Sequence, residues 1–192
     1  MNYRPLVTIA LVLTSLVVTL VAPIFDSSFY GVNGHPTEWL SFSPDAPLRH
    51  NGLSLIFSPF LHISFLHLLT NMVAFMPVAM MIERKKSGSN LILRFFFIHF
   101  KVLIILVIVN AFFSLGGKAF LGSSHVVVGL YTFWALNQKK YGMLLVPLLV
   151  LGIGLWDFNS LTSLAHLLGF LVGVGLFFLG SLLPKLGLKS SN

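Results

Sequence analysis

Four polar side chains, each set in a long apolar stretch, are the candidates for chemistry in this sequence. They are His67, Asn71, Ser124 and His166. A histidine beside a serine can take the hydroxyl proton and make the oxygen a nucleophile. Histidine suits this task because its ordinary pKa, about 6.5, lies near neutral pH. Ionisable groups inside a membrane are costly, so they are functional candidates by default.

The composition places these residues in a membrane protein. Hydrophobic residues make up 56% of the 192 positions and charged residues 9%, whereas a soluble domain carries about 25% charge. This excludes a cytosolic globule and a disordered chain. The chain has no cysteine, which excludes a disulfide framework, a thiolate metal site and a cysteine nucleophile. The net charge of +7 comes from short cationic clusters between apolar runs, so we expect no nucleic-acid partner.

The apolar runs predict an all-α, polytopic membrane protein with a single membrane domain over residues 1–192. A helix needs about 20 apolar residues to cross the bilayer. The six expected spans are 5–25, 62–82, 95–115, 124–138, 142–156 and 162–183. The first resembles a signal peptide, but its apolar run exceeds the usual length of about 7–15 residues, so we interpret it as a retained span.

Loop charges predict the orientation. With the N-terminus inside, ten of the twelve cations lie on the inner side, and only Arg49 and Lys118 lie outside. Lys101 counts as an inner cation because it can extend inward from the third span. Four of the five acids fall outside. This asymmetry obeys the positive-inside rule and predicts two cytoplasmic termini. The outer loop, 26–61, has the aromatic, Pro and Gly content of a folded segment at the membrane interface.

The fourth span is too short to cross the membrane. Its 15 residues reach about 22 Å, and Lys139 and Lys140 hold its inner end at the surface. The helix must therefore begin roughly 8–10 Å below the outer surface, and residues 116–123 must dip into the bilayer. Irregular backbone at that depth requires surrounding protein or a water-filled cavity.

The candidate residues share one depth. The second, fourth and sixth spans run inward, which places His67, Asn71, Ser124 and His166 in the outer half of the membrane. His67 and Asn71 are four residues apart and share a helix face. His62, five residues before His67, is expected to face elsewhere. We predict no metal site, because this histidine spacing does not chelate and no carboxylate shares the depth.

Each of these residues also has a purely structural interpretation. A membrane serine commonly bonds a backbone carbonyl, and a histidine or asparagine can hold two helices together. Small residues at 165, 169 and 173 on the sixth span, and Gly129 on the fourth, let helix backbones approach closely. Such approach is what a Ser–His hydrogen bond between two helices needs, but it is also a common packing device.

Three motifs in order resemble the rhomboid family of intramembrane serine proteases, in its compact six-span bacterial type. His62 to Asn71 looks like the family's HxxxxHxxxN. Gly122-Ser123-Ser124, with Gly129 five residues on, looks like its GxSGxxxxG-type serine motif. Ala165 to Gly173 looks like its AHxxGxxxG. The resemblance covers about residues 45–183.

The resemblance implies a role for each residue. Ser124 would be the nucleophile and His166 its general base, without an acidic third member. His67, Asn71 and the Ser124 backbone N–H would form the oxyanion hole. The implied partners are transmembrane protein substrates, cut near their outer end, and the lipid bilayer. The implied location is the inner membrane of a bacterial cell, with no cofactor and no metal.

Two departures from the family pattern stand out. His125 occupies the position after the serine, where the family usually has Gly. We expect it to crowd the oxyanion hole or alter the base without being the base, so that His125→Gly leaves activity intact or raises it. The family's Trp-Arg is replaced by Gly52-Leu53-Ser54-Leu55, so either Arg49 substitutes or the loop is held differently.

Three alternative functions stay open at this point. The chain could be an inactive rhomboid relative that binds membrane clients. It could be a small proton-coupled carrier that uses the membrane histidines, although we find no internal repeat of the kind that carriers show. It could also be a structural subunit, which leaves the sunken serine unexplained.

The orientation can be tested with introduced cysteines. Cysteines at positions 35 and 118 should react with a membrane-impermeant thiol reagent added to intact cells. Cysteines at positions 87 and 189 should react only after the cells are opened. Labelling at 87 in intact cells contradicts the predicted topology.

Overall fold

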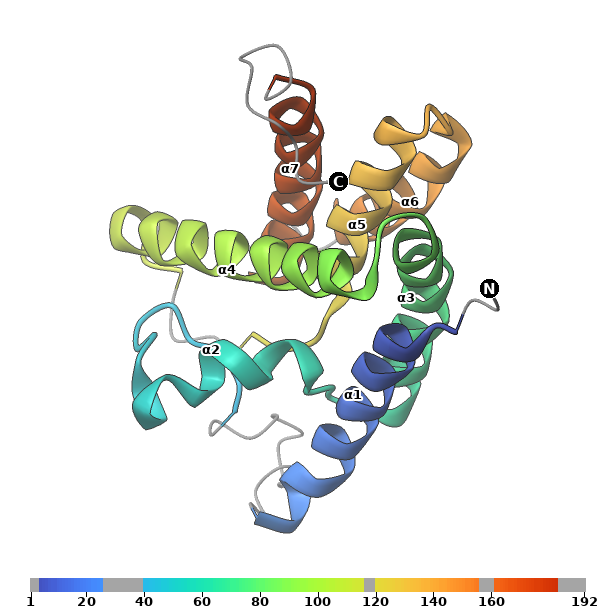
Figure 1. Cartoon of the computed structure of the whole chain (residues 1–192). Helices are drawn as coiled ribbons and strands as arrows, with labels where there is room; N and C mark the ends of the chain where they lie inside the picture. Colours follow the sequence, from blue (N-terminus) through green and yellow to red (C-terminus); the bar gives the residue numbers. More distant parts are fainter. Residues whose placement is uncertain (1–3, 26–39, 116–119, 156–160, 183–192) are drawn as a thin grey trace.

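The computed structural model describes residues 4–25, 40–115, 120–155 and 161–182 (Figure 1). Outside these ranges lie residues 26–39 of the predicted outer loop and residues 116–119 of the loop before Ser124. The cations Lys118, Lys185 and Lys189 also lie outside them. Most of the described part is helical, and it contains no strand, only one isolated bridge between Phe42 and Phe120. The all-α prediction is therefore confirmed.

Six α-helices of eleven residues or more form the bundle, and one short α-helix and three 3-10 turns connect them. The long helices are α1 (Leu6–Phe25), α3 (Phe65–Lys85), α4 (Gly88–Phe113), α5 (Ser124–Asn137), α6 (Leu145–Leu155) and α7 (Leu161–Leu182). The short elements are η2 (Arg49–Gly52), α2 (Leu53–Phe57), η3 (Ser58–Phe60) and η4 (Tyr141–Leu144).

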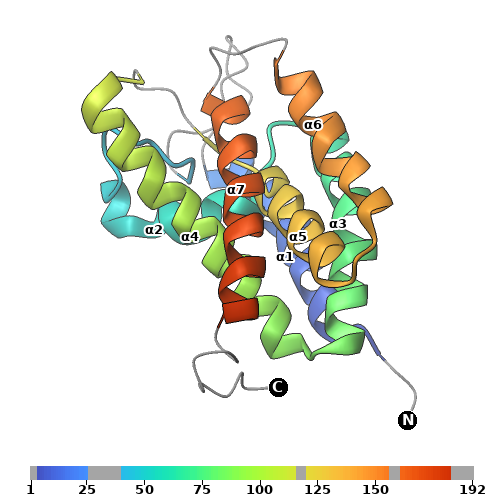
Figure 2. The same ribbon diagram turned by 90° about the horizontal axis from the view of Figure 1, so that it is seen from above.

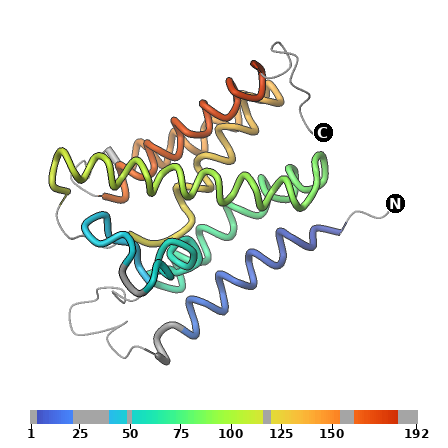
Figure 3. Tube along the Cα trace, turned by 60° about the vertical axis from the view of Figure 1, so that its left-hand side comes forward, coloured from blue at the N-terminus to red at the C-terminus, as the bar shows by residue number. Residues whose placement is uncertain are grey.

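Helix α5 forms the centre of the bundle. It contacts α3, α4, α6 and α7, which surround it (Figure 2). Residues 125–135 are all buried, as expected of a helix that is apolar on every side. Helix α1 lies at the edge of the bundle and packs against α3 and α4 (Figure 3). The nucleophile candidate thus begins the most enclosed helix of the protein.

Three of the described helices, α3, α4 and α7, are long and apolar enough to cross a membrane. Helix α1 and the η4–α6 segment contribute shorter apolar stretches, Leu6–Val21 and Tyr141–Ile153. Helix α5 has only 14 residues, about 21 Å. The short helix predicted over 124–138 is present as α5, and its depth in the membrane stays a prediction.

Serine caps set two helix starts that differ from the expected ones. Helix α3 begins at Phe65, three residues later than predicted, because the Ser64 hydroxyl accepts a hydrogen bond from the His67 N–H at 3.1 Å. Helix α4 begins at Gly88, seven residues early, where Ser87 accepts from the Asn90 N–H at 3.2 Å. An N-terminal serine satisfies backbone donors that have no partner within the helix.

The buried acid Glu83 joins the end of α3 to the start of α1. Its carboxylate accepts hydrogen bonds from the Val7 N–H, the Thr8 N–H and the Thr8 hydroxyl at 2.9, 2.9 and 2.7 Å. Free N–H groups at a helix start favour a negative charge. Three donors offset the cost of burying this carboxylate.

Several basic segments gather at one end of the bundle. Figure 2 shows the start of α1, the α3–α4 connection and the last turn of α7 together at that end. Arg84 and Lys85 close α3, and Lys139 and Lys140 follow α5. The Lys101 amine lies 5.6 Å from the Phe97 ring, one turn toward the same end. The arrangement agrees with the charge pattern, while the direction in the membrane stays a prediction.

Three glycines let α5 and α7 touch backbone to backbone. A Cβ on Gly169 would collide with the His125 carbonyl oxygen. A Cβ on Gly173 would lie 2.5 Å from the Gly129 carbonyl oxygen, and one on Gly129 would lie 2.9 Å from that of Gly169. Small residues at a crossing allow this approach, so the small-residue stripe is the α5–α7 contact.

Gly169→Ala should destabilise the protein, because its methyl group meets backbone that cannot rotate away. We expect a loss of about 1–3 kcal/mol, typical of overpacking, seen as a lower midpoint of thermal unfolding in detergent. Gly175→Ala on the same helix is the control, because nothing lies within 4 Å of its added Cβ. Equal stability of the two variants would contradict the backbone contact.

Candidate active site

A serine and a histidine from two helices meet in this site. The His166 Nε2 lies 2.7 Å from the Ser124 hydroxyl oxygen. Ser124 is the first residue of α5, and His166 lies in the second turn of α7. The α5–α7 crossing begins beside them, where the His125 carbonyl oxygen lies against Gly169. The two residues predicted to react together are therefore in hydrogen-bond contact.

The segment before Ser124 is enclosed by protein. Residues 120–123 are buried. Phe120 exchanges two backbone hydrogen bonds with Phe42, at 2.7 and 2.8 Å, and the Gly122 N–H donates to the Ser58 carbonyl at 2.8 Å. Gly122 has φ +95°, a conformation that suits glycine. The non-helical backbone of residues 120–123 is therefore enclosed by protein and hydrogen-bonded to neighbouring backbone, one of the two surroundings that the sequence predicted.

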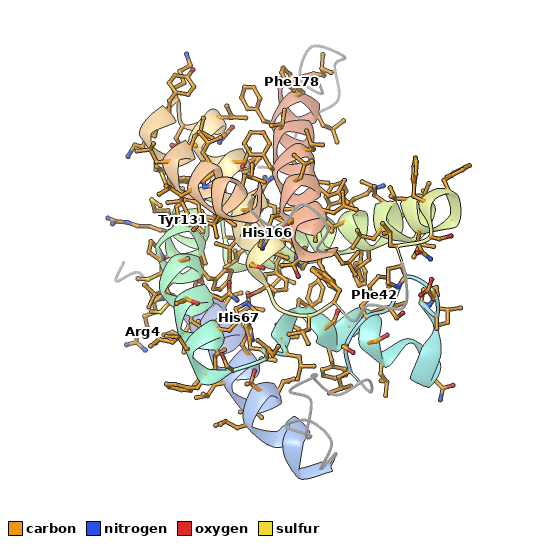
Figure 4. All side chains as sticks on the ribbon, turned by 180° about the vertical axis from the view of Figure 1, so that it is seen from behind. Arg4, Phe42, His67, Tyr131, His166 and Phe178 are labelled. Atoms are coloured by element: carbon orange, nitrogen blue, oxygen red, sulfur yellow. The ribbon has the colours of Figure 1, made fainter. Side chains whose placement is uncertain are left out.

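His67 and Asn71 face the same loop from α3. A Cβ built on Gly122 would lie 3.1 Å from the His67 Cε1 and 3.8 Å from the Asn71 Nδ2. Within the described part of the chain, the Asn71 Nδ2 and the His67 Nδ1 have no hydrogen-bond partner. The Asn71 amide thus has free N–H donors beside Gly122, which lies two residues before the nucleophile candidate. Figure 4 shows His67 on α3 and His166 on α7 in the same central region.

The start of α5 adds backbone donors. The first backbone hydrogen bond of this turn runs from the Val127 N–H to the Ser123 carbonyl. The N–H groups of the residues before Val127 therefore have no partner within the helix. They lie at the positive end of the helix dipole, which stabilises negative charge. Ser124 carries one of these N–H groups on the residue that bears the hydroxyl.

His166 bonds Ser124 and not its neighbour Ser123. The Ser123 hydroxyl is buried and has no hydrogen-bond partner among the described residues. The other ring nitrogen of His166, Nδ1, also has none there. The geometry is that of a two-residue Ser–His pair. In the described ranges, no three His, Asp or Glu side chains are placed to hold a metal ion.

The expectation that His62 faces away from His67 is wrong. Because Ser64 caps α3, His62 precedes the helix, and helical spacing does not apply to it. Its ring lies edge-on to the His67 ring, with centroids 5.2 Å apart. Its Nδ1 lies 3.1 Å from the Phe60 carbonyl, so Nδ1 must carry the proton and donate. His62 therefore packs edge-on against His67.

The contacts of His125 do not support the expectation that it crowds the oxyanion hole, and its alternative, an effect on the base, stays a prediction. Its ring is fully buried and turns to α4, where its Nε2 lies 3.0 Å from the His99 Nδ1. The His99 Nε2 lies 2.8 Å from the Leu55 carbonyl oxygen of α2. Sequence reasoning missed His99, because nothing local in α4 marks its partner 26 residues away. The sequence also suggested that Arg49 could substitute for the family's Trp-Arg, but its side chain lies outside the described part of the structure.

A comparison with models of known protein families shows which family the chain belongs to. The family model for the Rhomboid domain matches residues 49–182, more than two thirds of the chain. The chain belongs to the rhomboid family. Rhomboids are generally intramembrane serine proteases, and the family includes inactive members. The comparison with curated proteins found no match. The matched range of this rhomboid contains the serine, both histidines and the asparagine of the site.

If this rhomboid cleaves peptide bonds and His67 and Asn71 each supply one transition-state donor, alanine at either position should slow cleavage roughly tenfold to a thousandfold. His62→Ala should cost less. The His62 proton is on Nδ1 and bonded to Phe60, so its Nε2 has no hydrogen to donate. Turnover of a single-span membrane substrate in detergent measures all three. A loss in His62→Ala equal to that in His67→Ala would show that His62 donates directly.

Proposed function

We propose that this rhomboid is an intramembrane serine endopeptidase with a Ser124–His166 dyad. The observation that carries the proposal is the 2.7 Å contact between the His166 Nε2 and the Ser124 hydroxyl. The contact lies where α5 begins and the two helix backbones touch. In this position a hydroxyl can lose its proton to a neighbouring base.

The first half of the reaction forms an acyl-enzyme. With its proton on Nδ1, His166 accepts the Ser124 hydroxyl proton at Nε2 as the oxygen attacks the peptide carbonyl carbon. The carbonyl oxygen becomes an oxyanion. When this intermediate collapses, the C–N bond breaks, and the proton on Nε2 passes to the leaving amine. The acyl group remains esterified to Ser124.

The second half returns the enzyme. His166 takes a proton from water, and the resulting hydroxide attacks the ester carbonyl. Collapse of the second intermediate breaks the bond to the Ser124 oxygen, which recovers its proton from His166. The products are a new carboxylate and a new amine, and no redox or metal step is needed to balance the reaction.

His67, Asn71 and the Ser124 backbone N–H are the proposed oxyanion donors. The free Asn71 amide and the start of α5 support this assignment. Donors fixed in a site that excludes water are each worth about 2.7–4 kcal/mol to the transition state. The segment that leads into α5 is held rigidly, because its backbone is hydrogen-bonded to the backbone of Ser58 and Phe42.

The proposed substrates are transmembrane segments cut near their outer end. The basic connections lie at one end of the bundle, and the positive-inside rule assigns that end to the cytoplasm. The α5 start then opens toward the outer half of the membrane. The proposed location is the bacterial inner membrane, with both termini cytoplasmic. A segment unwound at that depth could present its carbonyl to Ser124.

A fluorophosphonate probe tests the dyad directly. It should label the wild-type protein in detergent, because an activated serine attacks its phosphorus. Ser124→Ala and His166→Ala should each abolish the labelling. Ser123→Ala is the matched control and should keep most of it, because the Ser123 hydroxyl makes no hydrogen bond to His166. In-gel fluorescence measures the labelling, and the far-UV spectrum and gel-filtration volume confirm that each variant is folded.

Three outcomes contradict the proposal. Undiminished labelling of Ser124→Ala refutes the nucleophile. A folded wild type without labelling favours the inactive, client-binding relative. Solute flux that follows a pH gradient and ignores Ser124→Ala favours the proton-coupled carrier.

A further inference from the structure

Two buried histidines behind the nucleophile are unused by the proposed reaction. His99 on α4 and His125 on α5 are fully buried, and their rings are hydrogen-bonded at 3.0 Å. His99 then reaches the Leu55 carbonyl of α2 at 2.8 Å. A buried polar chain of this kind is costly unless its members are paired. Its position beside Ser124 points to a role in the site.

The carbonyl at one end sets the proton positions along the chain. The Leu55 carbonyl only accepts, so the His99 Nε2 carries a proton and donates it. In the neutral ring the His99 Nδ1 is then an acceptor. The His125 Nε2 must therefore carry a proton and donate to it. Both hydrogen bonds of the chain form when both rings are neutral, and they run in one direction, from α5 through α4 to α2. The His125 Nδ1 is left without a partner among the described residues.

The same segment, α2 with η3, is tied to the α5 entry on both sides of Ser124. On one side the Ser58 carbonyl accepts from the Gly122 N–H, two residues before Ser124. On the other side the Leu55 carbonyl is linked through His99 to His125, one residue after it. Two anchors that bracket a residue fix both its place and its orientation.

We propose that His99 and His125 are positioning residues through which the α2 segment holds the Ser124 hydroxyl in line with His166. This inference rests on the proposed function of Ser124. It gives one explanation for both departures from the family pattern, His125 and the 52–55 stretch. The histidine that replaces the usual Gly after the serine holds, through His99, the stretch that lacks the usual Trp-Arg. His125→Gly should therefore lower activity, which reverses the expectation from sequence.

Other roles for the pair fit the contacts less well. His125 is not placed as the base, because its Nε2 is directed at His99 and His166 occupies the base position. Two histidines alone do not make a metal site, and no third ligand joins them among the described residues. A purely space-filling role needs no hydrogen bond to Leu55. The directed chain to a main-chain carbonyl is what positioning requires.

Paired substitutions at His99 separate positioning from packing. His99→Gln keeps both bonds, because its amide N–H can donate to Leu55 and its amide oxygen can accept from His125. His99→Leu fills the space and removes both bonds. The double variant His99→Leu/His125→Leu leaves no unpaired imidazole N–H and guards against a folding failure of the single one. Thr8→Val is the control for general stability, because it removes a buried hydrogen bond to Glu83 far from the site.

Two readouts follow each variant. The first is the rate of fluorophosphonate labelling, with kcat and KM for a single-span substrate. The second is independent of catalysis. Ile56→Cys, an exposed position on α2 in a chain without cysteine, carries a nitroxide label whose mobility is measured by EPR.

We expect His99→Leu and the double variant to label roughly tenfold to a hundredfold more slowly, the scale of a small misplacement of a reacting group. kcat should fall with little change in KM, and the label at position 56 should gain mobility. His99→Gln should restore both the rate and the immobile spectrum. Thr8→Val should lower the unfolding midpoint and leave both readouts unchanged.

The inference is overturned if His99→Leu labels at the wild-type rate, or if His99→Gln is as slow as His99→Leu. It is also overturned if the label at position 56 stays immobile in His99→Leu. Failure of the proposed function looks different. The wild type itself would then not react with the probe, while the EPR arm would still show whether the histidine pair anchors α2.

Discussion

Backbone contact between α5 and α7 is the constraint on which the rest of the site depends. Gly129, Gly169 and Gly173 leave no room for a side chain between the two helices. Lipid tails are as apolar as the side chains of the bundle, so membrane helices associate through packing and hydrogen bonds. Close packing at the glycines brings α7 near enough for His166 to reach Ser124. The 2.7 Å contact is a consequence of that crossing.

The need to pair buried backbone groups explains how the segment before α5 is held. A helix that begins inside the bundle leaves its N–H groups and the preceding loop without water, and each unpaired group is costly. The protein meets this demand with main-chain partners from the segment between α1 and α3, at Phe42 and Ser58. It adds the His99–His125 chain to Leu55. The Asn71 amide and the N–H groups at the start of α5 stay free beside Ser124, where a developing negative charge can use them.

The sequence predicted the all-α fold and the proximity of His67, Asn71, Ser124 and His166, because apolar length, charge asymmetry and helical spacing are local signals. His67 and Asn71 share a face in the structure as four-residue spacing requires. The prediction failed for His62, because a single serine cap moved the helix start past it. It missed the hydrogen bond of His125 because the partner, His99, is distant in the chain. Contacts between distant segments leave no local pattern, and neither error could be corrected from spacing.

Cleavage in a bilayer tests the central claim most directly. The protein is reconstituted in liposomes with a panel of single-span substrates, and the products of the wild type and Ser124→Ala are analysed by mass spectrometry. The account predicts a cut within or beside the outer end of a substrate span, made by the wild type and absent with Ser124→Ala. A cut that persists in Ser124→Ala, or a folded wild type that binds these segments and cleaves none of them, would contradict it.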